Sequence, residues 1–527
     1  MKRTEYFRLY LIVLLLQAGF PVTAQTKAQG SSKDAPLRVE IRANSDEETY
    51  RVQPYDARGI VIFYKSVETV RDTATNWYFS FYDKNLQQGW IRSVPIQSDF
   101  DFITSRSIND TIFFLFQAKG KKKEGQVNLF VLRLSMNTLR FMANTSSIDP
   151  DAGISGFDIS GDKLVVGYER KNAPAHLFYF DLLHGSRWNV PLTGETTSFI
   201  QQFSFDSTGN AVIVAFKNQV AKKYSEVNLA GYDTSGNQLH QVVLSTVNSD
   251  RSFTAVRFIP SGDSGFMVAG TYTINGQSAG KGKQEVLENH HGFFTTSITG
   301  WEQKAIRFYN FLNLNNASNL LTAKEMLLVK KKTAKKNSYP EEMAIGFNLL
   351  LYDLIKKGDQ LILVAETFYP QYHTENYTEF DFYGRPYTNS QTIFDGYRYT
   401  HGILAGFDKN GNIAWDNTME INDLMTFRPE EKISLYFTGN DLVLCYVNEG
   451  KIAYKIVRGN EVIEKLDYVP LEMLNAEDKV VSESKSRIVY WYGNYFLCYG
   501  FQEIKNLSAD RTGKRWVFFV NKIRFEE

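Results

Sequence analysis

The chain has 527 residues and a formal net charge of +1, with 59 Lys and Arg residues against 58 Asp and Glu residues. This near-neutral balance argues against a nucleic-acid or anionic-membrane partner held by bulk charge. Thirteen prolines and two cysteines exclude a collagen-like protein and a disulfide framework, whereas 14% aromatic residues suit half-buried pleated sheets.

Residues 1–24 predict a secretory signal peptide. Three basic residues precede an apolar run from Leu9 to Leu16, and the small residues Val22-Thr23-Ala24 precede Gln25, so we expect cleavage after Ala24. The alternative is a membrane anchor, but this run is too short to span a bilayer. We therefore expect an exported protein, periplasmic or extracellular, with no membrane span after cleavage.

The next segment, residues 25–36, is small and polar and predicts a flexible tether. The strand-like sequence LRVEIRA follows from Leu37. From there to residue 527 the chain predicts one all-β body.

The clearest unit of that body runs from Ile154 to Gly194. It contains the sequences ISGFDIS, KLVVGYER, HLFYFDLL and RWNVPL, each bounded by turn-forming residues. A single four-stranded sheet cannot bury both of its faces, so copies of the unit must stack on one another.

The unit recurs, and its marker is a Gly or Asn turn followed by an apolar strand. Markers begin at Gly59, Asn109, Gly161, Gly209, Gly262, Gly358, Gly439 and Gly493. Five of the seven spacings between them lie between 48 and 54 residues. That period fits four strands with their turns, the size of one β-propeller blade.

A second marker ends the third strand of a unit, where an aromatic residue and an Asp precede a turn. It occurs at Tyr82-Asp83, Phe180-Asp181, Tyr232-Asp233 and Phe407-Asp408. The Asp carboxylate can accept hydrogen bonds from its own turn, and a following Gly can adopt positive φ.

The two long spacings predict insertions. Residues 314–340 include SNLLTAKEMLLVKKKTAKK, whose good helix formers end in lysines, and we expect a helical insert between the fifth and sixth blades. Residues 369–400 predict a Tyr-rich loop between two strands of the sixth blade.

The last copy supplies only three strands, whereas the sequence from Leu37 supplies an extra one. We therefore predict a single eight-bladed β-propeller, closed when the amino-terminal strand joins the last blade, with seven blades as the alternative. The blade pattern resembles that of the secreted β-propellers of gram-negative bacteria, and this resemblance carries no functional motif.

Known chemical motifs are missing from the sequence. FDKNGNIAW, from Phe407, differs from the Asp box of sialidase-type propellers in its spacing, and it lacks the Gly and Glu of a calcium loop. No zinc-protease, nucleophile-elbow or nucleotide-binding motif appears. We expect no cofactor, no metal site and no enzymatic activity.

The cysteines and histidines leave alternatives open. Cys445 and Cys498 occupy equivalent strands of neighbouring blades, so we expect their thiols to face apart as free, buried groups. His176, His291 and His401 each precede a third strand; they either converge on a metal or, as we favour, lie apart in separate blades.

The Tyr-rich segment is the leading candidate site, because long loops are frequently functional and because Tyr and Arg are common in binding hot spots. The alternative is a long twisted hairpin that packs on the neighbouring blade. The candidate ligand-binding residues are Tyr369, Tyr372, His373, Tyr377, Tyr383, Arg385, Tyr387, Tyr397, Tyr399 and His401.

The sequence thus predicts a secreted, non-enzymatic scaffold whose loop face binds a protein or a glycan. One alternative is a carbohydrate-active hydrolase or lyase that uses Glu366, Asp381 and Asp395. Another is a structural subunit of a cell-envelope assembly.

Overall fold

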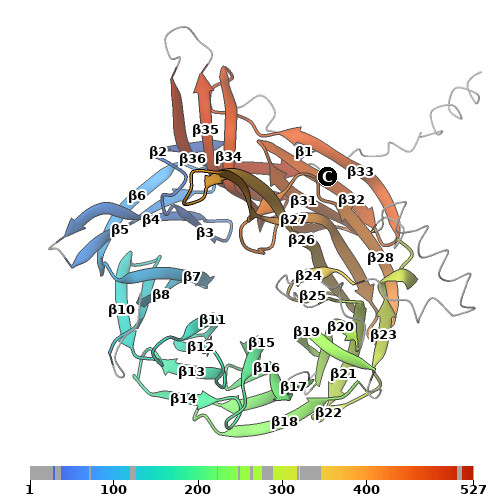
Figure 1. Cartoon of the computed structure of the whole chain (residues 1–527). Coiled ribbons are helices and arrows are strands. Elements are labelled where there is room, and N and C mark those ends of the chain that lie inside the picture. Colours follow the sequence, from blue (N-terminus) through green and yellow to red (C-terminus); the bar gives the residue numbers. More distant parts are fainter. Residues whose placement is uncertain are drawn as a thin grey trace, which may run out of the picture.

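Eight antiparallel sheets follow one another along the chain and are arranged in a ring (Figure 1). This computed structural model describes residues 28–29, 37–70, 73–118, 126–221, 224–246, 250–261, 265–275, 289–316, 320, 346–506 and 513–525. In Figure 1 the first strand of a sheet lies towards the middle of the ring and the last lies towards its rim.

Each of the first four sheets takes four consecutive strands. The first contains β3 (Arg51–Tyr55), β4 (Gly59–Val70), β5 (Ala74–Asp83) and β6 (Gln88–Gln97). The second contains β7 (Phe100–Ile108), β8 (Thr111–Ala118), β9 (Leu129–Ser135) and β10 (Arg140–Ser146). The third contains β11 (Gly153–Ser160), β12 (Lys163–Glu169), β13 (His176–Asp181) and β14 (Arg187–Pro191). The fourth contains β15 (Ser198–Phe205), β16 (Ala211–Ala221), β17 (Tyr224–Asp233) and β18 (Gln238–Leu244).

Of the other sheets, the fifth, sixth and eighth carry additional strands and the seventh has four. The fifth contains β19 (Arg251–Ser261), β20 (Gly265–Ile274), β21 (Gly292–Thr299), β22 (Glu302–Gln303) and β23 (Arg307–Asn310). The sixth contains β24 (Asn348–Leu351), β25 (Ile355–Lys357), β26 (Gln360–Phe380), β27 (Pro386–Phe407), β28 (Ile413–Glu420) and β29 (Met425–Thr426). The seventh contains β30 (Ser434–Thr438), β31 (Asp441–Asn448), β32 (Lys451–Arg458) and β33 (Glu461–Pro470). The eighth contains β34 (Asp478–Tyr492), β35 (Tyr495–Asn506) and β36 (Lys514–Phe525), with β2 (Arg38–Ala43) and β1 (Ala28–Gln29) paired to β36.

The apolar core lies between neighbouring sheets. Phe63 and Phe79 of the first sheet, for example, pack edge-on against Phe114 of the second, with ring centroids 5.0 Å apart in both pairs. Another cluster joins Ile60 of the first sheet to Phe518 of the last. Because every sheet buries both faces in this way, the aromatic-rich strands of the repeat are nearly all apolar in their middle.

The strand predicted from Leu37 is present as β2 and lies antiparallel to β36, with Ile41 opposite Phe518. The buried guanidinium of Arg38 donates to Asn521 Oδ1 and Gln502 Oε1, both at 2.8 Å. Ala28 and Gln29, which belong to the predicted tether, pair with the end of β36. The amino-terminal segment is therefore joined to both β36 and β35.

All but one of the predicted turns within the described residues have the expected backbone conformation; the exception is Gly59, whose φ is 153°. Glycines 161, 209, 358, 439 and 493 and Asn109 all have φ between 52° and 68°. In the second marker, Asp83, Asp181, Asp233 and Asp408 each accept a backbone N–H from the residue two positions ahead. The turn predicted at Gly262 lies outside the described residues.

The two predicted insertions have different outcomes. The helix predicted at residues 318–336 falls outside the described residues except for the buried Leu320; before it, η1 (Phe311–Asn313) is a 3-10 turn capped by Asn310. The loop prediction for residues 369–400 is wrong, because this segment is a continuation of β26 and β27.

The cysteine prediction is partly corrected. Cys445 and Cys498 are free and fully buried, as expected, and burial raises the pKa of both thiols. Their side chains do not face apart, however, because both lie in the cluster between the seventh and eighth sheets. Cys445 lies six residues after Gly439 and Cys498 five residues after Gly493, so the two positions are not equivalent. Because side chains alternate between the faces of a strand, this offset of one residue lets both thiols reach one interface.

Within the described ranges, no helix has the length and apolar character that crossing a bilayer requires.

Candidate functional site

The most prominent outgrowth of the ring is the hairpin of β26 and β27. The two strands stay paired from Leu361 opposite Phe407 to Phe380 opposite Pro386. On β27, Tyr397 and Arg398 also pair with β29, and they are the residues furthest along the hairpin that pair with a third strand. Beyond them, residues 371–396, which we call the arm, form a two-stranded ribbon about 30 Å long. In Figure 1 the hairpin extends from the sixth sheet across the ring towards the eighth.

The tip of the arm repeats the turn that ends third strands elsewhere in the ring. Asp381 Oδ1 accepts from the backbone N–H of Tyr383 at 2.9 Å and of Arg385 at 2.8 Å. Asp408 makes the same pattern of bonds in its turn. Gly384 has a φ of 72°, a conformation that glycine adopts without steric cost. The sequence FDFYG therefore encodes a tight hairpin turn.

Cross-strand side chains hold the arm together in place of a third strand. The rings of Tyr372 and Phe394 lie 5.4 Å apart across the two strands, and Phe394 also lies 5.1 Å from Tyr397 on its own strand. His373 bonds to Asp395, and Tyr387 donates to Glu379. Such opposed pairs are the unit of stabilisation in a two-stranded sheet.

Large aromatic side chains at the tip face solvent. Phe382 is 97% exposed, Tyr383 79% and Phe380 67%. The guanidinium of Arg385 lies 5.8 Å from the Tyr383 ring, within the range of a cation–π contact. An exposed phenylalanine gains nothing for the fold, so these rings do not stabilise the ring of sheets.

The exposure of the predicted site residues depends on their position along the hairpin. Tyr399 is buried, and its hydroxyl donates to the Glu430 carbonyl at 2.8 Å, so it is a packing residue. Half-buried positions at the root and on the arm are Tyr372, Tyr397 and His401. The exposed ones are Tyr369, His373, Tyr377, Tyr383, Arg385 and Tyr387.

Two described side chains on the arm have a shifted pKa, His373 and Tyr387, and hydrogen bonds to carboxylates raise the pKa of both. The His373 ring bonds to Asp395 and lies 3.4 Å from Glu375 Oε1. These contacts raise the pKa of His373, with the Asp395 hydrogen bond as the largest cause. The positive charge of the His373 imidazolium thus offsets part of the negative charge of the arm.

A cleft of about 400 Å³ opens at the base of the arm. The loop that follows β29 forms one wall and the middle of β34 forms the other, with Met425 and the 76% exposed Phe427 among its lining residues. Glu430 and Lys432 also line it. The cleft and the arm are continuous, because β29 pairs with the root of β27.

A group of charged side chains, the Glu430 cluster, lies beside this cleft. The Glu430 carboxylate is 2.6 Å from Lys432 Nζ and 2.7 Å from an Arg487 nitrogen. Arg51 and Tyr499 complete the cluster and interact electrostatically with Glu430 and Arg487. Such a group can bind an anion or transfer a proton.

Burial and charge oppose each other in the cluster. Burial alone would raise the pKa of Glu430, but Lys432 and Arg487 outweigh it and the pKa is lowered. Burial raises the pKa of Tyr499 and lowers that of Arg51. Glu430 is therefore ionised at neutral pH, whereas Tyr499 keeps its proton.

Glu366 lies deeper, between the sixth and seventh sheets. One carboxylate oxygen accepts from the Tyr352 hydroxyl and from the backbone N–H groups of Lys432 and Ile433. The other oxygen is buried and has no described partner. Burial raises the pKa of Glu366 to about 7.

The structure does not bring the three proposed catalytic acids together. Glu366 and Asp381 are separated by about 45 Å of strand, and the Asp395 carboxylate is bound to His373. Catalytic carboxyl pairs in glycosidases lie within about 10 Å. Asp381 in addition accepts the hydrogen bonds of its turn.

The three histidines also lie apart. His176 belongs to the third sheet, where its ring stacks on Tyr168, and His291 precedes β21 in the fifth sheet and accepts from Ile274 N–H at 3.1 Å. His401 lies in the sixth sheet. In the described part of the chain, no three His, Cys, Asp or Glu side chains gather as metal ligands would.

Sequence reasoning missed the tip phenylalanines and the Glu430 cluster. Phe380 and Phe382 could have been found, because FDFYG repeats the turn signal of FDKNG from Phe407. The cluster could not, because Arg51, Glu430 and Arg487 are far apart in the sequence and carry no common motif.

Known proteins resemble this chain in structure but not in sequence. No protein family and no curated protein matches the sequence. Solved structures do: the β-propeller domain of the Trilobed protease from Pyrococcus furiosus has 10% identity and a TM-score of 0.34, over 81% of this chain and 98% of that one. A PL25 ulvan lyase has 9% identity and a TM-score of 0.40, over 80% and 91%.

The dipeptidyl peptidase 4 of Porphyromonas gingivalis is similar at 10% identity and a TM-score of 0.41, over 90% of this chain and 60% of that one. Such distant likenesses carry no argument about activity. The class that the strand topology defines is the all-β propeller, with eight sheets in sequence order.

Proposed function

We propose that the chain is a non-enzymatic binding scaffold that presents the arm to a protein partner. The observation that carries the proposal is the tip, where Phe382 is 97% exposed on a ribbon without a third strand. Sites for small ligands are concave, whereas this surface projects from the ring. A projecting aromatic and Arg surface suits insertion into a groove of another protein.

The charge of the arm favours a protein over an anionic membrane. Residues 371–396 contain one arginine against four carboxylates, Glu375, Glu379, Asp381 and Asp395. Membrane-surface segments combine apolar side chains with an excess of Lys and Arg. The acidic arm instead suits a partner whose apolar groove has a basic rim.

We also infer that the ring is closed, so that the arm stands on a rigid support. The pairing of β2 with β36 and the apolar cluster between the first and last sheets support closure. A closed ring leaves no long unpaired strand edge at its ends. Cleavage after Ala24 and export belong to the same proposal, because a secreted scaffold would meet its partner outside the cytoplasm.

Site-specific photo-crosslinking tests the arm. A photoreactive phenylalanine analogue at position 382, in cells that naturally produce the protein, is expected to capture one protein. The matched control places the analogue at Leu183, a 68% exposed residue in a turn of the third sheet. Capture should fall when Phe380 and Tyr383 are changed to Ser. Equal capture at both positions, no capture, or a lipid adduct would contradict the proposal.

A carbohydrate-active hydrolase or lyase is the second candidate, and the Glu430 cluster favours it. The cluster joins ionisable groups with shifted pKa values to a cleft, as active sites commonly do. Turnover of any polysaccharide in a panel, lost in Glu430→Gln and Arg487→Met but kept in Arg58→Met, would favour this candidate. Arg58 is the control because its exposed guanidinium pairs with Asp110 in another part of the ring.

A further inference from the structure

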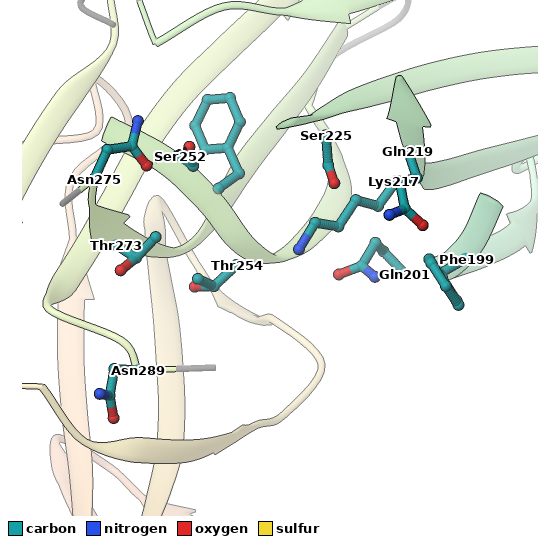
Figure 2. A pocket seen from close by; sticks show the side chains of 11 residues that line it. Phe199, Gln201, Lys217, Gln219, Ser225, Ser252, Thr254, Thr273, Asn275 and Asn289 are labelled. Carbon is teal, nitrogen blue, oxygen red and sulfur yellow. Dashed lines mark hydrogen bonds between the residues drawn. The ribbon is translucent and has the colours of Figure 1, made fainter. Parts of the chain in front are cut away.

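A second cleft, of about 560 Å³, lies between the fourth and fifth sheets (Figure 2). One wall comes from β15, β16 and β17, and the other from β19 and β20. The cleft opens where β16 turns into β17, which is the end of the fourth sheet that corresponds to the arm in the sixth. The lining residues are Phe199, Gln201, Lys217, Gln219, Ser225, Ser252, Phe253, Thr254, Thr273, Asn275 and Asn289.

Nine of the eleven described lining residues are polar, and one of them is charged. Lys217 is the cation, and none of the described lining residues is acidic. In Figure 2 the Lys217 side chain extends between the two walls, towards Thr254 and Gln201. A cleft with this lining favours a ligand that carries a negative group.

A buried histidine next to the cleft adds no second charge. His290 Nδ1 lies 2.9 Å from Thr254 Oγ1 and 2.7 Å from Thr271 Oγ1. Burial, followed by the charge of Lys217, lowers the pKa of His290 to about 3. His290 is therefore neutral at physiological pH, and among the described lining residues the positive charge is that of Lys217.

Several lining side chains have hydrogen-bonding capacity to spare. The side-chain amides of Gln201, Gln219 and Asn289 make no hydrogen bond to any described residue. Each amide offers both donors and an acceptor, which is what sugar hydroxyl groups require. Phe199, 42% exposed, adds an aromatic face on which a pyranose ring can lie.

The two walls are fixed relative to each other. Arg257 on β19 donates to the Gln201 carbonyl at 2.8 Å, and the Phe258 N–H donates to Gln202 Oε1 at 2.7 Å. These bonds join β15 to β19 directly beneath the cleft. A ligand would thus meet preorganised groups and lose little affinity to rearrangement.

From these observations we infer that the cleft binds an acidic oligosaccharide, a short chain of sugars in which one unit carries a carboxylate or a sulfate. The anionic group pairs with Lys217, the amides bind hydroxyl groups, and Phe199 contacts a ring face. A volume of about 560 Å³ suits a di- or trisaccharide. The site is separate from the arm and does not depend on the arm's partner.

Calorimetric titration of the full chain tests the inference. The probes are a galacturonate trimer, a sulfated galactose trimer and a neutral galactose trimer. At least one anionic trimer should bind, with an affinity at least about 10-fold above that of the neutral trimer, because a charge-assisted hydrogen bond is lost in the latter. The preferred trimer then identifies carboxylate or sulfate as the anionic group.

Two variants locate the bound ligand. Lys217→Met should weaken the anionic trimer about 10-fold and bring it close to the neutral one. Lys451→Met is the matched control, since this exposed lysine begins β32 at the corresponding end of the seventh sheet. Phe199→Ser should weaken both classes of trimer. Both lining residues are partly exposed, so unfolding temperatures should stay unchanged.

Three results would overturn the inference. They are no heat of binding for either anionic trimer at millimolar concentration, unchanged affinity in Lys217→Met, and an equal loss in Lys451→Met. Loss of the arm's partner, by contrast, should leave trimer binding intact, so failure of one proposal is distinguishable from failure of the other.

Discussion

Glu366 ties the sixth sheet to the seventh through one carboxylate oxygen. That oxygen accepts backbone N–H groups of Lys432 at 2.9 Å and Ile433 at 2.6 Å, next to the Tyr352 hydroxyl. The same loop continues into Glu430 at the base of the arm. A buried carboxyl group therefore fixes the position of the charged cluster beside the cleft.

Because the pKa of Glu366 rises to about 7 on folding, from an ordinary value of 4.5, the folded chain binds more protons than the unfolded chain between these pH values. Its contribution to stability is thus complete below pH 4.5 and is lost as the pH rises to about 7. The loss amounts to about 3 kcal/mol.

We expect Glu366→Gln to abolish this pH dependence, because the amide does not titrate. The quantity to measure is the difference in the free energy of unfolding between wild type and variant, by urea titration from pH 4 to pH 8. Buried His290, whose pKa is lowered to about 3, has the opposite effect and makes the fold more stable as the pH rises. Because wild type and variant both contain His290, its effect cancels in the difference between them. A difference that stays constant across this range would show that Glu366 is ionised in the fold.

At the scale of the element, the arm is a marginal structure on a stable base. A two-stranded ribbon has little apolar area to bury, so its order depends on a few cross-strand pairs such as Tyr372 and Phe394. The root differs, since Tyr399 is 1% exposed and belongs to the cluster between the sixth and seventh sheets.

Phe394→Ala should therefore loosen the arm and spare the ring. We expect amide hydrogens of residues 372–394 to exchange about 5-fold faster, for a cross-strand pair worth about 1 kcal/mol. Exchange in the ring and the unfolding temperature should not change. A drop of many degrees in unfolding temperature would show that the arm is part of the core.

The sequence predicted where this element lies in the ring, but not that its outer part is a pair of strands. The turn markers and the blade period are local signals, and they placed β26 and β27 in the sixth sheet. The exposed strands of the arm lack the apolar alternation that burial imposes, so their polar and aromatic composition suggested a loop. The Glu430 cluster depends on contacts between sheets, which no local pattern encodes.

At the scale of the whole molecule, the position of β2 decides which connections share a face. If β2 completes the eighth sheet, the hairpin connections between second and third strands all open on one side of the ring. The arm, the cleft at its base and the cleft between the fourth and fifth sheets then belong to one surface.

A disulfide tests this pairing directly. Arg42 and Val517 lie opposite each other on β2 and β36, a placement that suits a disulfide. We expect Arg42→Cys with Val517→Cys to form a bond under mild oxidation, seen as faster migration of the unfolded, unreduced chain. Arg42→Cys alone is the control. If the double variant stays reduced, β2 does not lie on β36.

The central claim is that the ring is a scaffold and the arm is its binding element. Pro370 lies opposite Tyr397, so an Asn-Gly turn can join them in place of residues 371–396. The decisive measurement is binding of the partner captured at position 382 to this armless chain, with near-ultraviolet circular dichroism as the check on folding. We predict an intact ring that does not bind the partner. An armless chain that binds with full affinity, or one that cannot fold, would contradict the account.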